Sequence, residues 1–138
     1  MTFDIVSFGS AVVDTFVNTD VSNKHNFLHY PVGAKLQIKD LKVDVGGGGT
    51  NTAVAFARLG LKTGCISAVG DDENGRRILH LLKKEHVTFL GPMRKNNMSG
   101  SSVILDSKDK DRTILTFKGV NEDIKEKDIK TFKTRWLY

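Results

Sequence analysis

The chain has few cysteines, few prolines and no long hydrophobic run. Its one cysteine, Cys65, lies in an apolar stretch and has no partner for an intrachain disulfide, so a reducing compartment is expected. The N-terminus carries Asp4 between short apolar runs, so neither a secretory signal nor a membrane span is expected. We therefore predict a cytoplasmic protein without a membrane partner.

Patterns for binding metal or nucleic acid are also missing. His25 and His29 have i, i+4 spacing, but no carboxylate or cysteine accompanies them, so we predict surface histidines and no metal site. The formal net charge of +5 comes mostly from lysines scattered over the second half, without an arginine stripe or interleaved aromatic residues. This pattern argues against nucleic acid as a partner and fits a mild positive field toward an anionic cosubstrate.

The most informative feature that is present is the run Gly46–Gly49, followed by Thr50, Asn51 and an apolar stretch. The run predicts a turn into a buried helix, with free N–H groups at the helix start that suit an oxygen-rich ligand. The spacing excludes both a Walker-type phosphate loop and a dinucleotide fingerprint. The Asn51 amide both donates and accepts hydrogen bonds, which matches a sugar hydroxyl better than a phosphate. A tight strand-to-helix turn without a ligand is the alternative.

Hydrophobic periodicity predicts an alternation of strands and helices. The length of 138 residues fits one domain. Residues 18–30 are predicted to form a loop, and a phase slip near Asp40 predicts a bulge in the third strand. Asp71-Asp72 is predicted to supply the N-cap of the second helix, Gly60 to close the first helix at its C-cap, and the last two strands to form a hairpin. The strands are predicted at residues 3–8, 12–17, 35–45, 62–69, 87–90, 101–105 and 113–117, and the helices from the glycine run to Leu59, from Asp72 to Lys84 and over 122–133.

The order of these elements predicts two layers. Strand, helix, strand, helix, strand is typical of a parallel sheet with right-handed crossovers. The strands at 12–17, 36–45, 101–105 and 113–117 do not fit that sheet and are predicted to form a separate, half-exposed antiparallel layer. The final apolar run, Trp136 to Tyr138, is typical of the start of a buried strand. We therefore expect the chain to be the front part of a larger protein.

These residues resemble the PfkB (ribokinase-like) family of carbohydrate and nucleoside kinases. The family's first signature is met by Gly46, Gly47, Gly49, Asn51, Ala53, Gly60 and Gly70. Other stretches that agree in order are Gly9-Ser10 with Asp14, Val69 to Asp72 with Gly75, Asp111 to Thr113, and Gly119 to Asn121. The resemblance implies an α/β fold: a ribokinase-like, partial Rossmann-type parallel sheet with flanking helices and a small antiparallel β lid.

The resemblance also implies a function and a site. Residues 1–138 would be the N-terminal substrate-binding and lid portion, which binds a sugar or nucleoside between the sheet and the lid. Asp14 and Asn51 would bind substrate hydroxyls through their side chains, and Gly47 and Gly48 would approach the substrate through their backbone. Val12 and Gly48 replace an Asn and a Lys of ribokinases, which argues against ribose itself and leaves another sugar or a nucleoside open. The lid would also serve as a homodimer interface.

The family's second signature, Asp-Thr-x-Gly-Ala-Gly-Asp, is absent from the chain. In the family it carries the general base and the anion hole, so we assign no catalytic residue and expect the chain alone to be inactive. ATP and Mg²⁺ would be cofactors of the full-length kinase only. The alternative is a non-catalytic sugar-binding module, or a module that assembles through its lid.

Overall fold

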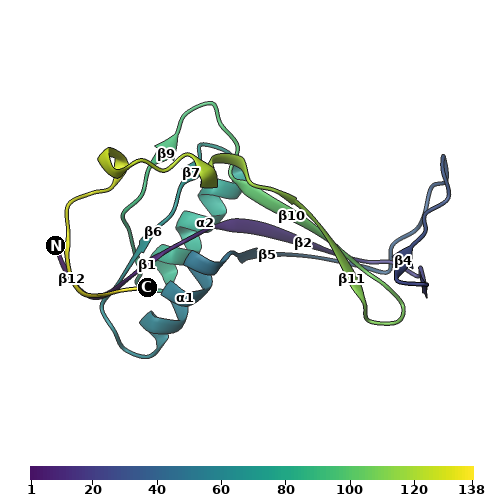
Figure 1. Ribbon diagram of the computed structural model, residues 1–138, viewed down its shortest axis with the longest axis horizontal. Helices are drawn as coiled ribbons and strands as arrows, with labels where there is room; N and C mark the ends of the chain where they lie inside the picture. Colours follow the sequence, from purple (N-terminus) through teal and green to yellow (C-terminus); the bar gives the residue numbers. More distant parts are fainter.

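Two sheets organise residues 1–138, all of which are described in the computed structural model (Figure 1). The first sheet lies in a body that also contains both helices and both chain termini. Its four strands have the order β12-β1-β6-β8, and every neighbouring pair is parallel. Their bounds are β1 Thr2–Phe8, β6 Thr63–Ile66, β8 Thr88–Phe89 and β12 Lys133–Leu137. The predicted parallel sheet is confirmed.

The second sheet, here called the lid sheet, extends away from the body as a long ribbon (Figure 1). It has the order β11-β10-β2-β5, with bounds β2 Val12–Asn18, β5 Asp40–Gly46, β10 Gly100–Asp106 and β11 Arg112–Phe117. The predicted antiparallel layer is confirmed for the pairs β10–β11 and β2–β5, but it is wrong for the central pair, because β10 runs parallel to β2. Both strands leave the body at their first residue and run outward, which requires a parallel pair.

The two helices cover one side of the body. Helix α1 spans Gly48–Arg58, and Gly60, with φ +88°, follows its end. The N–H groups of Gly60 and Leu61 bind the carbonyls of Ala57 and Phe56, so the predicted glycine stop forms a Schellman motif. Helix α2 spans Glu73–Lys84 and begins at the predicted N-cap, whose side chain accepts a hydrogen bond from the Gly75 N–H.

Helix α1 is less buried than its apolar sequence predicts. It contacts β1 and β6 along one face, where Gly49, Thr50 and Ala53 are buried. Leu59, just beyond its end, is 77% exposed. The expectation of a buried helix is therefore wrong for the outer face of α1, where Asn51, Ala55 and Arg58 are exposed.

The lid sheet departs from prediction along β5 and the preceding loop. Strand β5 begins at Asp40 and not at residue 35, and its pairing with β2 is continuous from Asp40 to Gly46, so the predicted bulge is absent. The phase slip instead marks the place where the strand starts. The predicted loop 18–30 contains a short hairpin of β3 Asn23–Lys24 and β4 Phe27–Leu28 at the lid tip.

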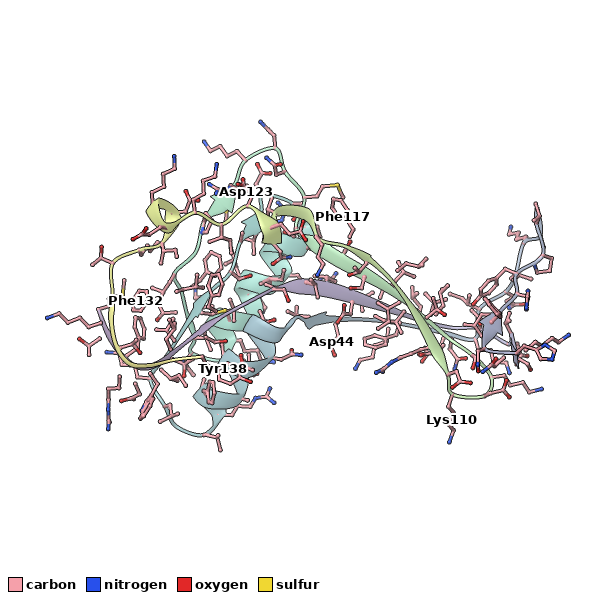
Figure 2. All side chains as sticks on the ribbon, viewed as in Figure 1. Asp44, Lys110, Phe117, Asp123, Phe132 and Tyr138 are labelled. Atoms are coloured by element: carbon pink, nitrogen blue, oxygen red, sulfur yellow. The ribbon has the colours of Figure 1, made fainter.

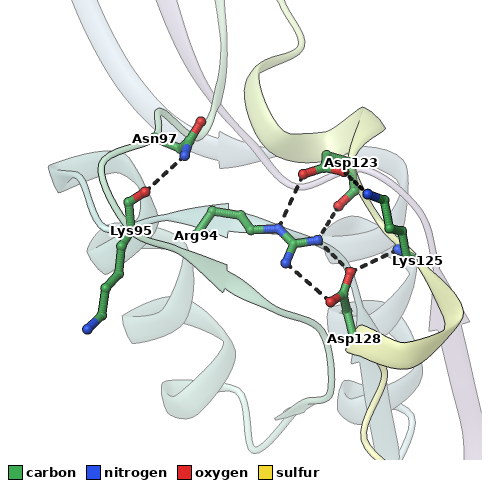
Figure 3. Close-up of polar contacts among 6 residues, drawn as sticks. All are labelled: Arg94, Lys95, Asn97, Asp123, Lys125 and Asp128. Atoms are coloured by element: carbon green, nitrogen blue, oxygen red, sulfur yellow. Dashed lines mark hydrogen bonds and ion pairs between the residues drawn. The ribbon is translucent and has the colours of Figure 1, made fainter.

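The predicted helix over 122–133 is wrong. Its residues form two short 3₁₀ helices, η1 Gly119–Glu122 and η2 Glu126–Asp128, followed by an extended segment. The cause lies in Arg94, on strand β9 Met93–Arg94, which pairs with β7 Val69–Gly70. Its guanidinium binds the Asp128 carboxylate and the Asp123 carbonyl, and holds this segment against the body (Figure 3).

Two apolar clusters form the core. The larger lies between the helices and the first residues of the lid, and the smaller lies on the other face of the parallel sheet, where Ile129 and Phe132 pack against it. The larger cluster contains Ala11, Val13, Ala53, Cys65, Val69, Ile78, Leu82 and Val87, and the smaller contains Phe3, Val6, Ile66 and Leu90.

The final apolar run does form a strand, β12, which pairs with β1. Its side chains are not buried, however, because Trp136, Leu137 and Tyr138 are 69%, 66% and 67% exposed. Tyr138 lies beside α1, where its ring contacts Phe56 edge to face, and Phe132 lies at the outer side of the body (Figure 2). One edge and much of the surface of β12 are therefore uncovered.

Candidate functional site

The glycine run forms the turn between β5 and α1, and close packing explains three of its four members. A Cβ on Gly46 would overlap the Asp14 carboxylate, and a Cβ on Gly49 would lie 2.7 Å from the backbone carbonyl of Gly9. Gly47 has φ +99° and ψ +143°, a conformation available essentially to glycine, and touches the Ser10 carbonyl. The fold itself thus requires Gly46, Gly47 and Gly49.

Gly48 differs from the other three glycines. It is the first residue of α1, it is exposed, and a Cβ built on it would meet no atom within 4 Å. The fold leaves open space at this position. Gly48 is therefore the place in the turn where a ligand can approach the backbone.

The sequence predicts free N–H groups at the start of α1, and this prediction is wrong because they are hydrogen-bonded to Ser10. The Ser10 hydroxyl accepts a hydrogen bond from the Gly48 N–H (3.3 Å). The Ser10 carbonyl accepts hydrogen bonds from the N–H groups of Gly49 (3.0 Å) and Thr50 (3.4 Å). Ser10, which lies between β1 and β2, thus caps the start of α1. The helix start is therefore not an anion site. Sequence reasoning noticed Ser10 only through the resemblance and gave it no role.

Asp14 lies beside this turn, on β2. Its carboxylate is in contact with Gly46, it is half-buried, and it makes no hydrogen bond or ion pair. Asp44, its pair on β5, is by contrast engaged with Lys42 (3.0 Å) and with the Val45 N–H (2.9 Å). The hydrogen bond from Lys42, and then the one from Val45, lower the pKa of Asp44 below its ordinary value. Of the two carboxylates, Asp14 is the one available to accept hydrogen bonds from a ligand.

Asn51 lies one turn into α1, exposed and without a side-chain hydrogen bond. It lines a hollow of about 410 Å³ together with Asp44, Val54 and Arg58. The structure thus brings Asp14 and the glycine turn into contact, whereas Asn51 lies next to Asp44, the strand partner of Asp14.

Asn121 is a further residue that sequence reasoning did not place in the site. Its amide donates to the Ala11 carbonyl (2.9 Å) and accepts from the Ala11 N–H (2.9 Å), as a paired strand would. It also binds Ser67 (3.3 Å) and the Lys118 carbonyl (3.0 Å). Asn121 therefore fixes the turn that leads to Asp14 against the loop after β11.

The donors present do not form a cation site. No group of three or more His, Cys, Asp or Glu side chains is placed to hold a metal ion. Cys65 is buried, and burial raises the pKa of its thiol to about 12, which makes it a packing residue and not a nucleophile or ligand. We assign no magnesium ligand to this chain. No helix is both long enough and apolar enough to cross a membrane.

Comparison with known proteins identifies the family. The model for "pfkB family carbohydrate kinase" matches residues 2–137. The chain belongs to the pfkB family of carbohydrate kinases. Ribokinase of Dictyostelium discoideum is 30% identical over 134 residues, which are 96% of this chain and 40% of that protein. Ribokinase of Bacillus subtilis (strain 168) is 31% identical over 123 residues, 88% of this chain and 39% of that protein.

Solved structures agree with the pfkB assignment. Arabidopsis thaliana ribokinase complexed with ribose and ATP has a TM-score of 0.72 and 26% identity, covering 88% of this chain and 38% of that one. Adenosine kinase from Sinorhizobium meliloti, at 18% identity and a TM-score of 0.73, shows the shared fold. The predicted ribokinase-like fold is confirmed, and the chain spans about 40% of the length of the curated ribokinases it matches.

Proposed function

We propose that residues 1–138 are the acceptor-binding and lid portion of a pfkB-family kinase, which phosphorylates a hydroxyl of a sugar or nucleoside with ATP and Mg²⁺. Asp14, Gly47, Gly48 and Asn51 bind the acceptor. The nucleotide and metal are held by parts of the kinase outside these residues. A cytoplasmic location, predicted from the lone cysteine, belongs to the same proposal.

The observation that carries this proposal is the unpaired Asp14 carboxylate in contact with the glycine turn. The Asp14 carboxylate has no partner within the chain, so each of its oxygens can accept a hydrogen bond from a ligand hydroxyl. Gly48 leaves the backbone next to it uncovered. Together these groups provide acceptors and space but neither a base nor an anion hole, so the chain binds without transferring a phosphoryl group.

Calorimetry with a panel of sugars and nucleosides tests the binding. We expect at least one member to bind the wild-type chain and to lose its affinity in Asp14→Ala. Asp40→Ala is the control, because Asp40 is an exposed carboxylate at the other end of β5, paired with Asn18 and away from the glycine turn. If no member binds, or if Asp14→Ala binds as well as the wild type, the proposal is wrong.

An ATP-turnover assay on the same chain tests the second half of the proposal. Phosphoryl transfer depends on positioned charge around the transferred group, and we assign no such groups here. We expect no turnover above background with any acceptor that binds. Turnover clearly above background would contradict the proposal that the chain alone does not transfer a phosphoryl group.

A second function, assembly through the lid, is supported by one face of the lid sheet. Strand register places five exposed apolar side chains on the same face, namely Leu41, Val43, Val103, Leu115 and Phe117. Light scattering of the wild type and of Leu115→Asp tests whether this face forms a homodimer. A dimer that dissociates in the variant supports it, and a monomeric wild type at high concentration rejects it.

A further inference from the structure

A row of polar side chains crosses the lid sheet on the face that carries Asp14. Asp14 of β2 is paired with Ser102 of β10, and Ser102 is paired with Thr116 of β11. Paired residues of neighbouring strands point to the same face, with about 4.8 Å between strands. Asp14 therefore has two hydroxyl-bearing neighbours toward the outer strand of the lid.

The middle member of the row is recessed and oriented. Ser102 is only 7% exposed, whereas Thr116 is exposed. The two hydroxyl oxygens lie 3.1 Å apart, so one donates to the other. A hydroxyl has one donor and two acceptor sites, which leaves Ser102 with capacity for a further hydrogen bond. Ser102 is thus the most buried member of the polar row and lies between Asp14 and Thr116.

An apolar row lies next to this polar row. On the same face and one row farther from the body, Ile104 of β10 is paired with Phe16 of β2 and with Ile114 of β11. A polar row next to an apolar row complements a hydroxylated ring, which presents hydroxyl groups and C–H groups side by side. Neither a phosphate nor a purely apolar ligand would satisfy both rows.

We propose that Ser102, oriented by Thr116, is a specificity-determining residue that binds the acceptor hydroxyl adjacent to the one bound by Asp14. The inference rests on the proposed function and narrows its substrate class to acceptors with hydroxyls on neighbouring carbons. A purely structural Ser102–Thr116 pair would affect stability and leave the choice between ligands unchanged.

The test compares D-ribose and adenosine with their 2-deoxy counterparts, titrated into the ¹⁵N-labelled chain. We expect the wild type to prefer the ligands with the complete diol. Ser102→Ala should lower their affinity about tenfold, the scale of one lost hydrogen bond, and abolish the preference. Ser102→Thr keeps the hydroxyl and should retain the preference. Ser101→Ala is the matched control, because the adjacent Ser101 faces the other side of the sheet.

The outcomes separate this inference from the proposed function. If ligand binding depends on Asp14 but Ser102→Ala keeps the wild-type preference, the role of Ser102 is wrong and the proposed function stands. If the wild type binds none of the four ligands, the substrate class is wrong, and the wider calorimetric panel decides the proposed function. Thermal unfolding of Ser102→Ala checks that the variant is folded.

Discussion

At the scale of single residues, the glycine turn contains one position that only glycine can occupy and one that would accept a side chain. Gly47 combines a backbone conformation reserved for glycine with contact to the Ser10 carbonyl, whereas Gly48 has an ordinary φ and open space. The four glycines thus combine a folding requirement with an accessible backbone. The tight-turn interpretation of the sequence thus accounts for Gly46, Gly47 and Gly49, and ligand binding at Gly48 stays a prediction.

The two positions predict opposite effects of alanine. Gly47→Ala should lower the free energy of unfolding by at least about 2 kcal/mol, since the strained conformation and the contact with Ser10 both act against it. Gly48→Ala should raise it by about 0.5 kcal/mol, because alanine restricts the unfolded chain and favours a helix start. Urea denaturation measures both. Equal losses in the two variants would contradict the assignment of open space to Gly48.

Asn121 is predicted to matter for stability more than an exposed loop asparagine does. Asn121→Ala removes a paired set of hydrogen bonds to Ala11 and should cost about 1–3 kcal/mol, because the Ala11 groups lose their partners. Asn97, whose side chain binds only the Lys95 carbonyl on the surface, is the control. A melting temperature of Asn121→Ala equal to that of Asn97→Ala would show that the hydrogen bonds between Asn121 and Ala11 do not stabilise the chain.

At the scale of elements, the start of α2 depends on an ionised carboxylate. Asp72 accepts hydrogen bonds from the Ser99 hydroxyl (2.6 Å), the Ser99 N–H (3.0 Å) and the Gly75 N–H (2.8 Å). Partial burial acts to raise the pKa of Asp72, but these hydrogen bonds outweigh it, and the pKa is lowered. Asp72 thus joins the helix to the segment that leads into β10.

This lowered pKa predicts an acid dependence of stability. The contribution of Asp72 is complete above the ordinary carboxyl pKa of about 4 and is lost as the pH falls through the lower folded value. Asp72→Asn should be less stable by about 1 kcal/mol at pH 7, because an amide donor meets the Ser99 N–H. Its stability should also fall less than that of the wild type on acidification. Parallel urea curves at every pH would contradict this.

Arg94 is predicted to hold the segment from η1 to η2 in place. Arg94→Ala removes the contacts to Asp123 and Asp128, so hydrogen exchange of backbone amides over residues 120–128 should become faster. Arg76→Ala is the control, because its ion pair with Glu73 is exposed and lies within α2. Unchanged exchange in Arg94→Ala would mean that apolar packing alone holds the segment.

The elements that the sequence predicts well are those with local signals. The hairpin of β10 and β11, the cap at Asp72 and the stop at Gly60 depend on neighbouring residues and are confirmed. The helix predicted over 122–133 does not form, because Arg94, some thirty residues earlier in the chain, binds Asp123 and Asp128. The parallel β2–β10 pair was missed since it depends on the path of the whole chain.

The site follows the same division. The resemblance singled out Asp14 and the glycine run from motif spacing, and the structure places them in contact. Ser10 caps α1, and Asn121 is hydrogen-bonded to the backbone of Ala11. Both contacts join residues far apart in the chain. No local pattern contains that information, so only the folded chain reveals them.

At the scale of the whole molecule, the lid and the body meet at the glycine turn. Strand β5 belongs to the lid sheet and α1 to the body, and Gly47 alone separates them. A ligand bound between Asp14 and Gly48 would therefore contact both parts at once. Under the proposed function, the acceptor would thus be held entirely within this chain, which spans about 40% of the length of the curated ribokinases it matches.

The most direct test of the account is whether Asp14 and the glycine turn form one binding site. The backbone amides of the ¹⁵N-labelled chain are followed by NMR while an acceptor from the calorimetric panel is added. We predict that the signals of Asp14, Gly47 and Gly48 shift together with one affinity, and that the signals of Gly47 and Gly48 do not shift in Asp14→Ala. Shifts confined to other regions, or shifts of the glycine turn that persist in Asp14→Ala, would contradict the account.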